Sequence, residues 1–124
     1  MYAKKKVFIS GPITGHDEPK VKSAFNYAES KISEKNLFPL NPVVVQPPAR
    51  LTDKEEIWSY CMKVTISMML NADAIYMLPN WQGSRGASLE RQIGLNLGIP
   101  VHYNLDDLYI YTEGNNPTKE VIVS

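Results

Sequence analysis

The sequence predicts a single α/β domain of three layers, in which helices cover both faces of an open and mainly parallel β-sheet. Short β-branched and aromatic runs alternate with segments of helical periodicity along the chain. The connections between the strand-like runs are long enough for a crossover helix and for little else, which is typical of parallel strands. A chain of 124 residues has the size of one domain, so residues 1–124 are expected to share one hydrophobic core.

The first strand and the first helix are indicated by the N-terminal part of the chain. Residues 6–10, Lys-Val-Phe-Ile-Ser, are expected to form a buried strand that ends at Gly11-Pro12. A helix should follow from Pro19 to about Asn36, capped by Asp17 or a neighbouring residue. The apolar face of this helix would consist of Val21, Phe25, Ala28 and Ile32.

The middle of the chain predicts a short strand, a loop and a second helix. A strand is expected within residues 37–42, where two prolines make it leave the sheet early, and residues 43–51 are expected to form a loop. The second helix should begin near Thr52 or Asp53, because the Thr-x-x-Glu pattern that starts at Thr52 has the spacing of a capping box. It should end near Asn71.

The predicted second helix is apolar around much of its circumference. One row consists of Ile57, Cys61, Val64 and Met68, and a neighbouring row consists of Trp58, Met62 and Met69. The helix is therefore expected to be mostly buried. So broad an apolar surface exceeds what a helix on a sheet needs, and it predicts a homodimer or a larger homo-oligomer.

The last third of the chain repeats the alternation of strand and helix. A third strand is expected at residues 72–78, and the loop over residues 79–86 that follows it is rich in residues that break helices and strands. The third helix should span residues 87–97 and end at Gly98, a left-handed C-cap. Further strands are expected at residues 99–103 and, as possible edge strands, at residues 108–111 and 121–123.

Charge and cysteine content exclude several classes of protein. Thirteen basic and thirteen acidic residues cancel, so nucleic acid is not expected as a partner. Cys61 is the one cysteine, which excludes an internal disulfide and fits a reducing cytoplasm. No Cys or His cluster has the spacing of a metal site, and no stretch has the length of a membrane span. We therefore expect a cytoplasmic protein that binds no membrane and uses neither a metal nor a cofactor.

Two loops have the residues needed to bind an anion such as phosphate. Residues 10–15, Ser-Gly-Pro-Ile-Thr-Gly, follow the first strand, and Ser84-Arg85-Gly86 opens the third helix. In open parallel sheets, ligands bind outside the C-terminal ends of the strands, where helix N-termini point free amides inward. Arg85 could pair with a phosphate or point to solvent. Both loops lack the Walker and dinucleotide spacings, and glycines that merely turn the chain are the alternative.

Glu90 is a candidate reactive carboxylate because it lies four residues after Gly86. From the first turn of the predicted helix, its side chain should project toward the same strand ends as the two loops. The alternative is that the carboxylate only complements the helix dipole, which contributes about 0.3–1 kcal/mol.

Several segments of the chain resemble one protein family. They are residues 7–15, Phe25, Ala28-Glu29, Asn41-Pro42, residues 73–81 and residues 84–90. Together they are similar to the nucleoside 2-deoxyribosyltransferase-like superfamily, in particular to a small branch of bacterial and phage proteins. The most specific part is the pattern Trp-x-x-Ser-x-Gly-Ala-x-x-Glu, and the likeness spans about residues 6–103. The resemblance implies a Rossmann- or flavodoxin-like fold.

The resemblance also implies an enzyme that acts on small nucleosides or nucleotides. Members of the superfamily cleave the N-glycosidic bond and pass the sugar to another base or to water, after a glutamate attacks the anomeric carbon. On this chain Glu90 matches that nucleophile, and a carboxylate suits this step without any metal. Ser84 and Gly86 match the cradle of a 5′-phosphate, and Ser10 and Gly11 would line the sugar side.

One position departs from the family's pattern. Eight residues before Asp73, where the family usually has an aspartate that protonates the base, this chain has Thr65. Threonine is not a carboxylic acid near neutral pH, so the usual source of that proton is missing. The alternative function is therefore a non-catalytic nucleotide-binding or sensor protein. A plain helix position without a part in the site is the favoured interpretation of Thr65 itself.

Other polar and aromatic residues are expected to have structural roles more often than ligand contacts. His16 is expected to be exposed, although it could face a base, and His102 is expected to be a packed or an edge residue of its strand. Tyr76 and Trp81 could stack on a base but are more often core residues in such positions. Asp73 is expected to have a structural role at the edge of its strand.

Overall fold

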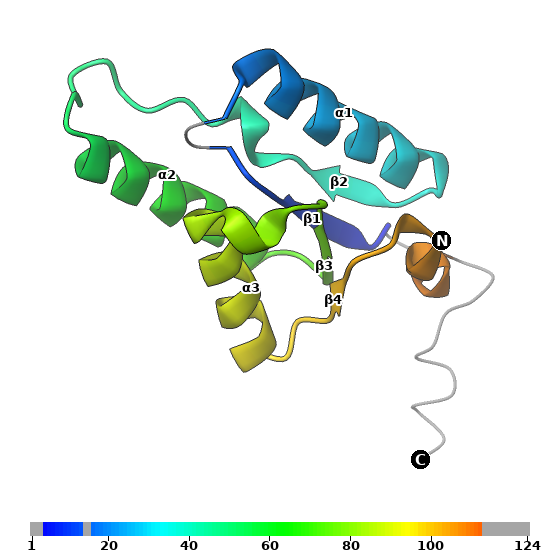
Figure 1. Cartoon of the computed structure of the whole chain (residues 1–124). Coiled ribbons are helices and arrows are strands. Elements are labelled where there is room, and N and C mark those ends of the chain that lie inside the picture. The colour runs from blue at the N-terminus through cyan, green and yellow to red at the C-terminus, as the bar shows by residue number, and fades with distance from the viewer. Residues whose placement is uncertain (1–3, 14–15, 113–124) are drawn as a thin grey trace.

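The computed structural model describes residues 4–13 and 16–112. Within them, four strands form one sheet in the order β2-β1-β3-β4, and every neighbouring pair is parallel. The strands are β1 (Lys6–Ser10), β2 (Phe38–Leu40), β3 (Ala74–Met77) and β4 (Val101–His102). Helices lie on both faces of the sheet (Figure 1). The predicted open α/β fold with a parallel sheet is confirmed.

Side chains of the two central strands alternate between the two faces of the sheet. In β1, Val7 and Ile9 pack into one core cluster and Phe8 packs into the other. Strand β3 alternates in the same way. A strand that is buried on both faces carries a continuous apolar run, which is why these segments lack a polar face. Ser10 lies two residues after Phe8 and therefore faces the same side of the sheet as Phe8.

The helices divide into two layers. Helix α1 (Glu18–Glu34) covers the face of Val7 and Ile9, while α2 (Lys54–Met69) and α3 (Arg85–Asn96) cover the opposite face (Figure 1). The apolar face predicted for α1 is confirmed, because all of its predicted members are buried: Val21, Phe25, Ala28 and Ile32.

In the described part of the chain, each of the three α-helices begins at a polar side chain that caps it. Asp17, Asp53 and Ser84 each accept the backbone N–H of the residue three positions ahead. The cap at Ser84 starts α3 at Arg85, two residues earlier than predicted. Glu90 consequently lies in the second turn of α3, and its predicted place in the first turn is wrong. A carboxylate in the second turn gains little from the helix dipole, which acts mainly within the first turn.

The segment after β4 is a 3-10 helix, η3 (Leu105–Tyr111), and the edge strand predicted at residues 108–111 is wrong. Leu105 and Leu108 are three residues apart, which is the period of a 3-10 helix, and both pack into the core on the α1 side. Tyr111 packs there too, whereas a strand over residues 108–111 would have sent Leu108 and Tyr111 to opposite faces. The other possible edge strand, at residues 121–123, lies outside the described residues.

Helix α2 is less buried than predicted. Met62, Thr65 and Met69 are its buried residues. The predicted row of Ile57, Cys61, Val64 and Met68 has intermediate exposure, and Met68 in this row packs against the core cluster of Phe8. In the described part of the chain, neither α2 nor any other helix has the length and apolar character needed to cross a membrane.

The strand order creates a crevice at the C-terminal ends of β1 and β3. From β1 the chain crosses through α1 to β2 on one side, and it later runs from β3 through α3 to β4 on the other side. The two connections thus leave neighbouring strands toward opposite faces of the sheet. Ligands of open α/β sheets bind at such switch points.

Candidate active site

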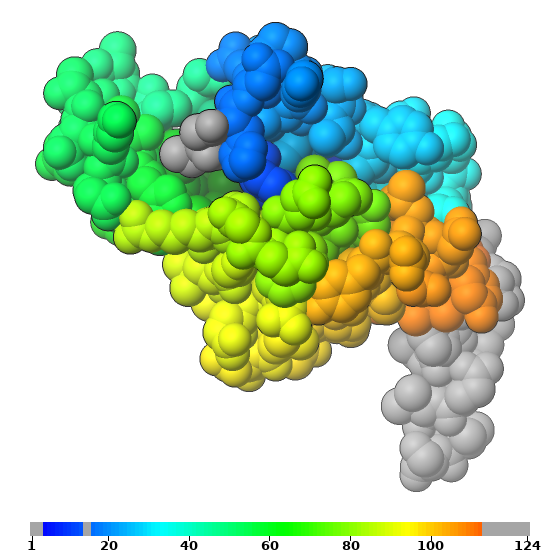
Figure 2. Space-filling view, viewed as in Figure 1, coloured from blue at the N-terminus to red at the C-terminus, as the bar shows by residue number. Residues whose placement is uncertain are grey.

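A cavity of about 400 Å³ opens beside the ends of β1 and β3. Its walls come from the loop after β1, from residues 42–45, from one side of α2 and from the first half of α3. The surface is recessed between the green atoms of α2 and the blue atoms near the start of α1 (Figure 2). This volume is in the range of small-molecule sites. Five predicted site residues line the cavity: Gly11, Ser84, Arg85, Gly86 and Glu90.

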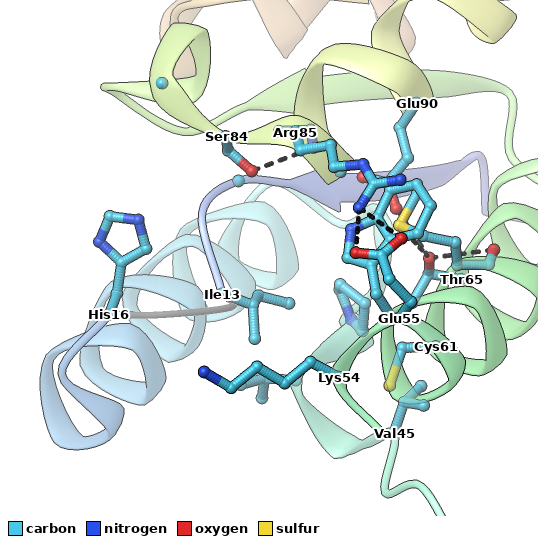
Figure 3. Close-up of a pocket in the computed structure, with 18 residues that line it drawn as sticks. Ile13, His16, Val45, Lys54, Glu55, Cys61, Thr65, Ser84, Arg85 and Glu90 are labelled. Carbon is cyan, nitrogen blue, oxygen red and sulfur yellow. Dashed lines mark hydrogen bonds and ion pairs between the residues drawn. The ribbon is translucent and has the colours of Figure 1, made fainter. Parts of the chain in front are cut away.

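Glu90 lies in the cavity wall, and both of its carboxylate oxygens accept hydrogen bonds from buried hydroxyls. The Ser10 hydroxyl donates to Oε1 over 2.6 Å, and the Thr65 hydroxyl donates to Oε2 over 2.8 Å. The Glu90 side chain is 5% exposed and descends from α3 toward Thr65 on α2 (Figure 3). These two bonds fix the carboxylate in one position.

Three elements supply these groups, and the strand and helix periods explain why they meet. Ser10 ends β1 on the face that α2 and α3 cover. Thr65 lies on the buried side of α2, one turn from Met62 and one turn from Met69. Glu90 is among the buried residues of α3, on the side that packs toward the sheet. The buried carboxylate therefore sits where the three elements converge.

Burial raises the pKa of the Glu90 carboxyl above its usual range, and the hydrogen bonds from Ser10 and Thr65 lower it in part. Burial has the larger effect because the free energy lost when the charged carboxylate leaves water exceeds the free energy gained from two neutral hydrogen-bond donors. A carboxyl with a raised pKa that faces a cavity is typical of catalytic groups.

The structure changes the roles of two residues. Ser10, which we expected to line the sugar side, is completely buried behind Glu90 and does not line the cavity. Thr65, which we expected to be a plain helix residue, lines the cavity and donates to Glu90. That interpretation of Thr65 is wrong because a buried hydroxyl needs a hydrogen-bond partner, and the carboxylate provides one.

The first turn of α3 is the second polar feature of the cavity. The Ser84 hydroxyl accepts the N–H of Ala87 over 3.1 Å. The first amides of a helix have no carbonyl partner within the helix, so the N–H groups of Arg85 and Gly86 are available to an anion. A Cβ at Gly86 would lie 3.0 Å from the Sδ of Met62, so this close approach of α3 to α2 favours glycine.

The Arg85 side chain is 58% exposed and is already paired with a carboxylate of the protein. Its Nη1 donates to both carboxylate oxygens of Glu55, over 3.1 and 2.9 Å. Its guanidinium also lies 3.5 Å from the ring centre of Trp58. Figure 3 shows Arg85 of α3 meeting Glu55 of α2. An anion that binds Arg85 through Nη1 has to compete with the Glu55 carboxylate.

Among the lining residues of α2 that were not predicted as part of the site, three share one helix face with Thr65. They are Glu55, Trp58 and Met62, and with Thr65 they follow one another at steps of three, four and three along one helix face. The available signal was Thr65 itself, a polar residue within the apolar row of Trp58, Met62 and Met69. A polar residue in such a row indicates a buried hydrogen-bond partner.

Three other candidates lie away from Glu90. His16 lines the cavity, but Figure 3 places its ring on the opposite side from Glu90. Tyr76 is buried in the core on the α1 side. Trp81 packs against Tyr103, with ring centres 6.0 Å apart, and is not a lining residue. Stacking of a base in this cavity therefore involves neither aromatic ring.

His102 and Asp73 have structural roles, as predicted. The Nε2 of His102 is hydrogen-bonded to the Tyr111 hydroxyl over 2.6 Å, and Asp73 accepts the backbone N–H of Lys6 over 2.7 Å. Among residues 4–13 and 16–112, no group of three His, Cys, Asp or Glu side chains is placed to hold a metal ion.

Comparison with known proteins identifies the fold. The family model described as Domain of unknown function (DUF4406) matches residues 5–103. A solved structure of a 2-deoxyribosyltransferase from the psychrotolerant bacterium Bacillus psychrosaccharolyticus is similar with a TM-score of 0.64 and 17% sequence identity, over 88% of this chain and 93% of that chain. Curated proteins give no match. The expected 2-deoxyribosyltransferase-like fold is thereby confirmed.

Proposed function

The chain belongs to the family described as Domain of unknown function (DUF4406), and we propose that it binds a nucleoside or deoxynucleoside 5′-monophosphate and cleaves the N-glycosidic bond. The observation that supports this most is the carboxylate of Glu90, held by two buried hydroxyls in the wall of a ligand-sized cavity. The shared fold adds support, because the similar transferase is described as a biocatalyst for the synthesis of nucleosides.

Glu90 is the proposed nucleophile. One carboxylate oxygen forms a bond to the anomeric carbon while the bond from that carbon to the base breaks. An ionised carboxylate has about four acceptor positions, so the bonds from Ser10 and Thr65 leave lone pairs for this attack. Water or a second base then takes the sugar and releases the carboxylate.

The first turn of α3 is the proposed phosphate site. The free amides of Arg85 and Gly86 lie at the positive end of the helix, and the Ser84 hydroxyl keeps its own proton for a ligand oxygen. Arg85 keeps its Nη1 on the Glu55 carboxylate and would donate to the phosphate from its Nε and Nη2. Glu90 follows Gly86 by four residues, a rise of about 6 Å along the helix, which suits a substrate that places its sugar between the two groups.

Release of free base from a panel of nucleoside and deoxynucleoside 5′-monophosphates tests this function. We expect turnover by the wild-type protein and a loss of about a thousandfold or more in kcat/KM for Glu90→Gln. The matched control is Glu56→Gln, because Glu56 is exposed on α2 and does not line the cavity. Base release that persists in Glu90→Gln would exclude the role of Glu90.

Nucleotide binding without turnover is the second candidate function. The observation that favours it is the Thr65 hydroxyl, which donates to Glu90 at a position where the resembling enzymes have an acid. Thermal unfolding with nucleotides separates the two functions, because ligand at 100 times its Kd adds about 2.7 kcal/mol to the free energy of unfolding. Stabilisation without base release would favour a sensor.

We also propose that α2 mediates self-association. Ile57 and Val64 remain partly exposed on α2, and Leu70 just beyond the helix is 53% exposed. Apolar side chains that stay exposed along one helix are typical of contacts between copies of one chain.

A further inference from the structure

Among the described residues, no cation forms an ion pair with the Glu90 carboxylate. The side chain is 5% exposed, and its partners are the neutral hydroxyls of Ser10 and Thr65. A buried charge without an opposite charge is costly, so a cationic group in the cavity would be stabilised beside this carboxylate.

The hydroxyls beside Glu90 have no proton to offer a leaving base. A hydroxyl carries a single hydrogen, and both Ser10 and Thr65 direct theirs at the carboxylate. Cys61 also lines the cavity, but burial raises the pKa of its thiol and makes it a weaker acid. Of the described groups beside Glu90, a leaving base therefore meets hydrogen-bond acceptors rather than acids.

The other charged groups among the described lining residues lie elsewhere. The Glu55 carboxylate is engaged by Arg85 through two hydrogen bonds. Figure 3 places His16 and the ammonium of Lys54 across the cavity from Glu90. The described residues thus place a nucleophile, Glu90, at the reacting carbon but no carboxylic acid that could protonate the leaving base.

We infer that the site is suited to N-glycosides whose base carries a positive charge, such as the 5′-monophosphate of a pyridinium or of an N-alkylated purine. This inference rests on the proposed function, with Glu90 as the nucleophile. When a Glu90 oxygen bonds to the anomeric carbon, the electron pair of the breaking C–N bond stays on the ring nitrogen. A cationic base then leaves as a neutral molecule and needs no proton, whereas a neutral purine leaves as an anion that must be protonated. Water next attacks the anomeric carbon, loses one proton to solvent and releases the Glu90 carboxylate.

Two substrates that differ in one methyl group test the inference. Guanosine 5′-monophosphate is neutral in its base, and 7-methylguanosine 5′-monophosphate carries a positive charge there. After subtraction of the rates without protein, we expect a kcat/KM at least about 100-fold higher for the methylated substrate, because a positioned general acid contributes about 10²–10⁴-fold. Nicotinamide mononucleotide, a pyridinium, is expected to react at a rate close to that of the methylated purine.

Addition of an acid at position 65 should change this preference. Thr65→Asp is expected to raise the cleavage of guanosine 5′-monophosphate and to reduce the ratio between the two substrates. The matched control Ser67→Asp adds the same side chain at an exposed position of α2 outside the cavity, and it should leave the ratio unchanged. If Thr65→Asp does not fold, the wild-type ratio decides alone.

Failure of the inference differs from failure of the proposed function. Cleavage of both guanine substrates within about tenfold of each other, dependent on Glu90, would overturn the preference for a cationic base and leave the function standing. Cleavage that Glu90→Gln does not reduce, or no cleavage of any of the three substrates, would contradict the function as well.

Discussion

Glu90 is a buried carboxylate that the fold orients without neutralising. The hydroxyls of Ser10 and Thr65 hold its oxygens, yet the pKa of the carboxyl stays above its usual range because burial outweighs these bonds. A neutral side chain at this position would avoid the cost of a buried charge. Residues that lower stability in this way are typical of functional sites.

Glu90→Gln should therefore stabilise the protein at neutral pH. Between the pKa of an unfolded glutamate, about 4.3, and the raised pKa of folded Glu90, the folded chain binds more protons than the unfolded chain. The free energy of unfolding consequently falls as the pH rises through this window. We expect a higher Tm for the variant at pH 7, and a gain that disappears below about pH 4.

Calorimetry at both pH values, with Glu56→Gln as the control, checks this expectation. The control removes an exposed carboxylate, so its Tm should follow that of the wild type at each pH. If Glu90→Gln is less stable than the wild type at pH 7, the charged carboxylate stabilises the fold and the expectation is wrong.

Thr65→Val should displace the pH profile of base release. In the wild type, the Thr65 hydroxyl 2.8 Å from Oε2 of Glu90 lowers the pKa of the carboxyl. The substitution keeps the shape of the side chain but removes this donor. Without it the pKa of Glu90 rises further, so the acid limb of kcat/KM against pH moves to higher pH. Loss of a hydrogen bond to a charged group should also cost about 1.5–3 kcal/mol of stability. Thr65→Ser restores the donor and should move the limb back; a limb that stays in place in Thr65→Val would contradict the role of this hydroxyl.

At the residue scale, the sequence predicts the chemical groups better than their partners. Glu90 and the loop at Ser84 are recognisable because they belong to one short local pattern. The hydroxyls that hold Glu90 are separated from it by 80 and 25 positions in the chain. Local periodicity cannot predict such pairs, because they arise only when β1, α2 and α3 pack together.

Ser84 has two roles at the scale of the element, since it caps α3 and lines the cavity. Ser84→Ala should lower stability by about 1 kcal/mol through loss of the cap, and it should also weaken nucleotide binding. The matched control is Asp17→Ala, which removes a similar cap from α1 outside the cavity. We expect similar stability losses in urea unfolding, with a weaker affinity for nucleoside monophosphates in Ser84→Ala alone. Equal affinities in the two variants would contradict a phosphate site at this turn.

The elements whose sequence pattern agrees with their packing are the ones predicted correctly. Helix α1 combines a cap at Asp17 with a regular apolar face, and both appear in the structure. The start of α3 was misplaced because Arg85 and Gly86 look like loop residues until Ser84 is recognised as the cap. The strand predicted at residues 108–111 is wrong because the β-like composition conceals the three-residue spacing with which Leu108 and Tyr111 pack against the core.

The partly exposed apolar side chains of α2 predict the behaviour of the whole molecule in solution. Sedimentation is expected to show a homodimer or a larger assembly of the wild-type chain. Val64→Glu places a charge in the partly exposed apolar row and should shift the protein toward monomers, whereas Lys22→Glu on α1 should not. Monomers alone at high wild-type concentration would contradict self-association through α2.

The architecture follows from the sequence at the largest scale because alternation of strands and helices leaves few arrangements. The parallel order β2-β1-β3-β4 places the ends of β1 and β3 side by side, and the two predicted loops follow these ends. The contribution of α2 to the cavity is not visible in this alternation. It depends on how closely α2 packs against α3. Side-chain volumes set this distance, such as that of Met62, which lies against Gly86.

The position of a bound substrate tests the central claim most directly. In a crystal structure of Glu90→Gln with a nucleoside 5′-monophosphate, we expect the anomeric carbon about 3–3.5 Å from the side chain of residue 90. The phosphate should lie at the first amides of α3, next to Ser84 and Gly86. A nucleotide bound elsewhere, or one that turns its sugar away from residue 90, would contradict the account.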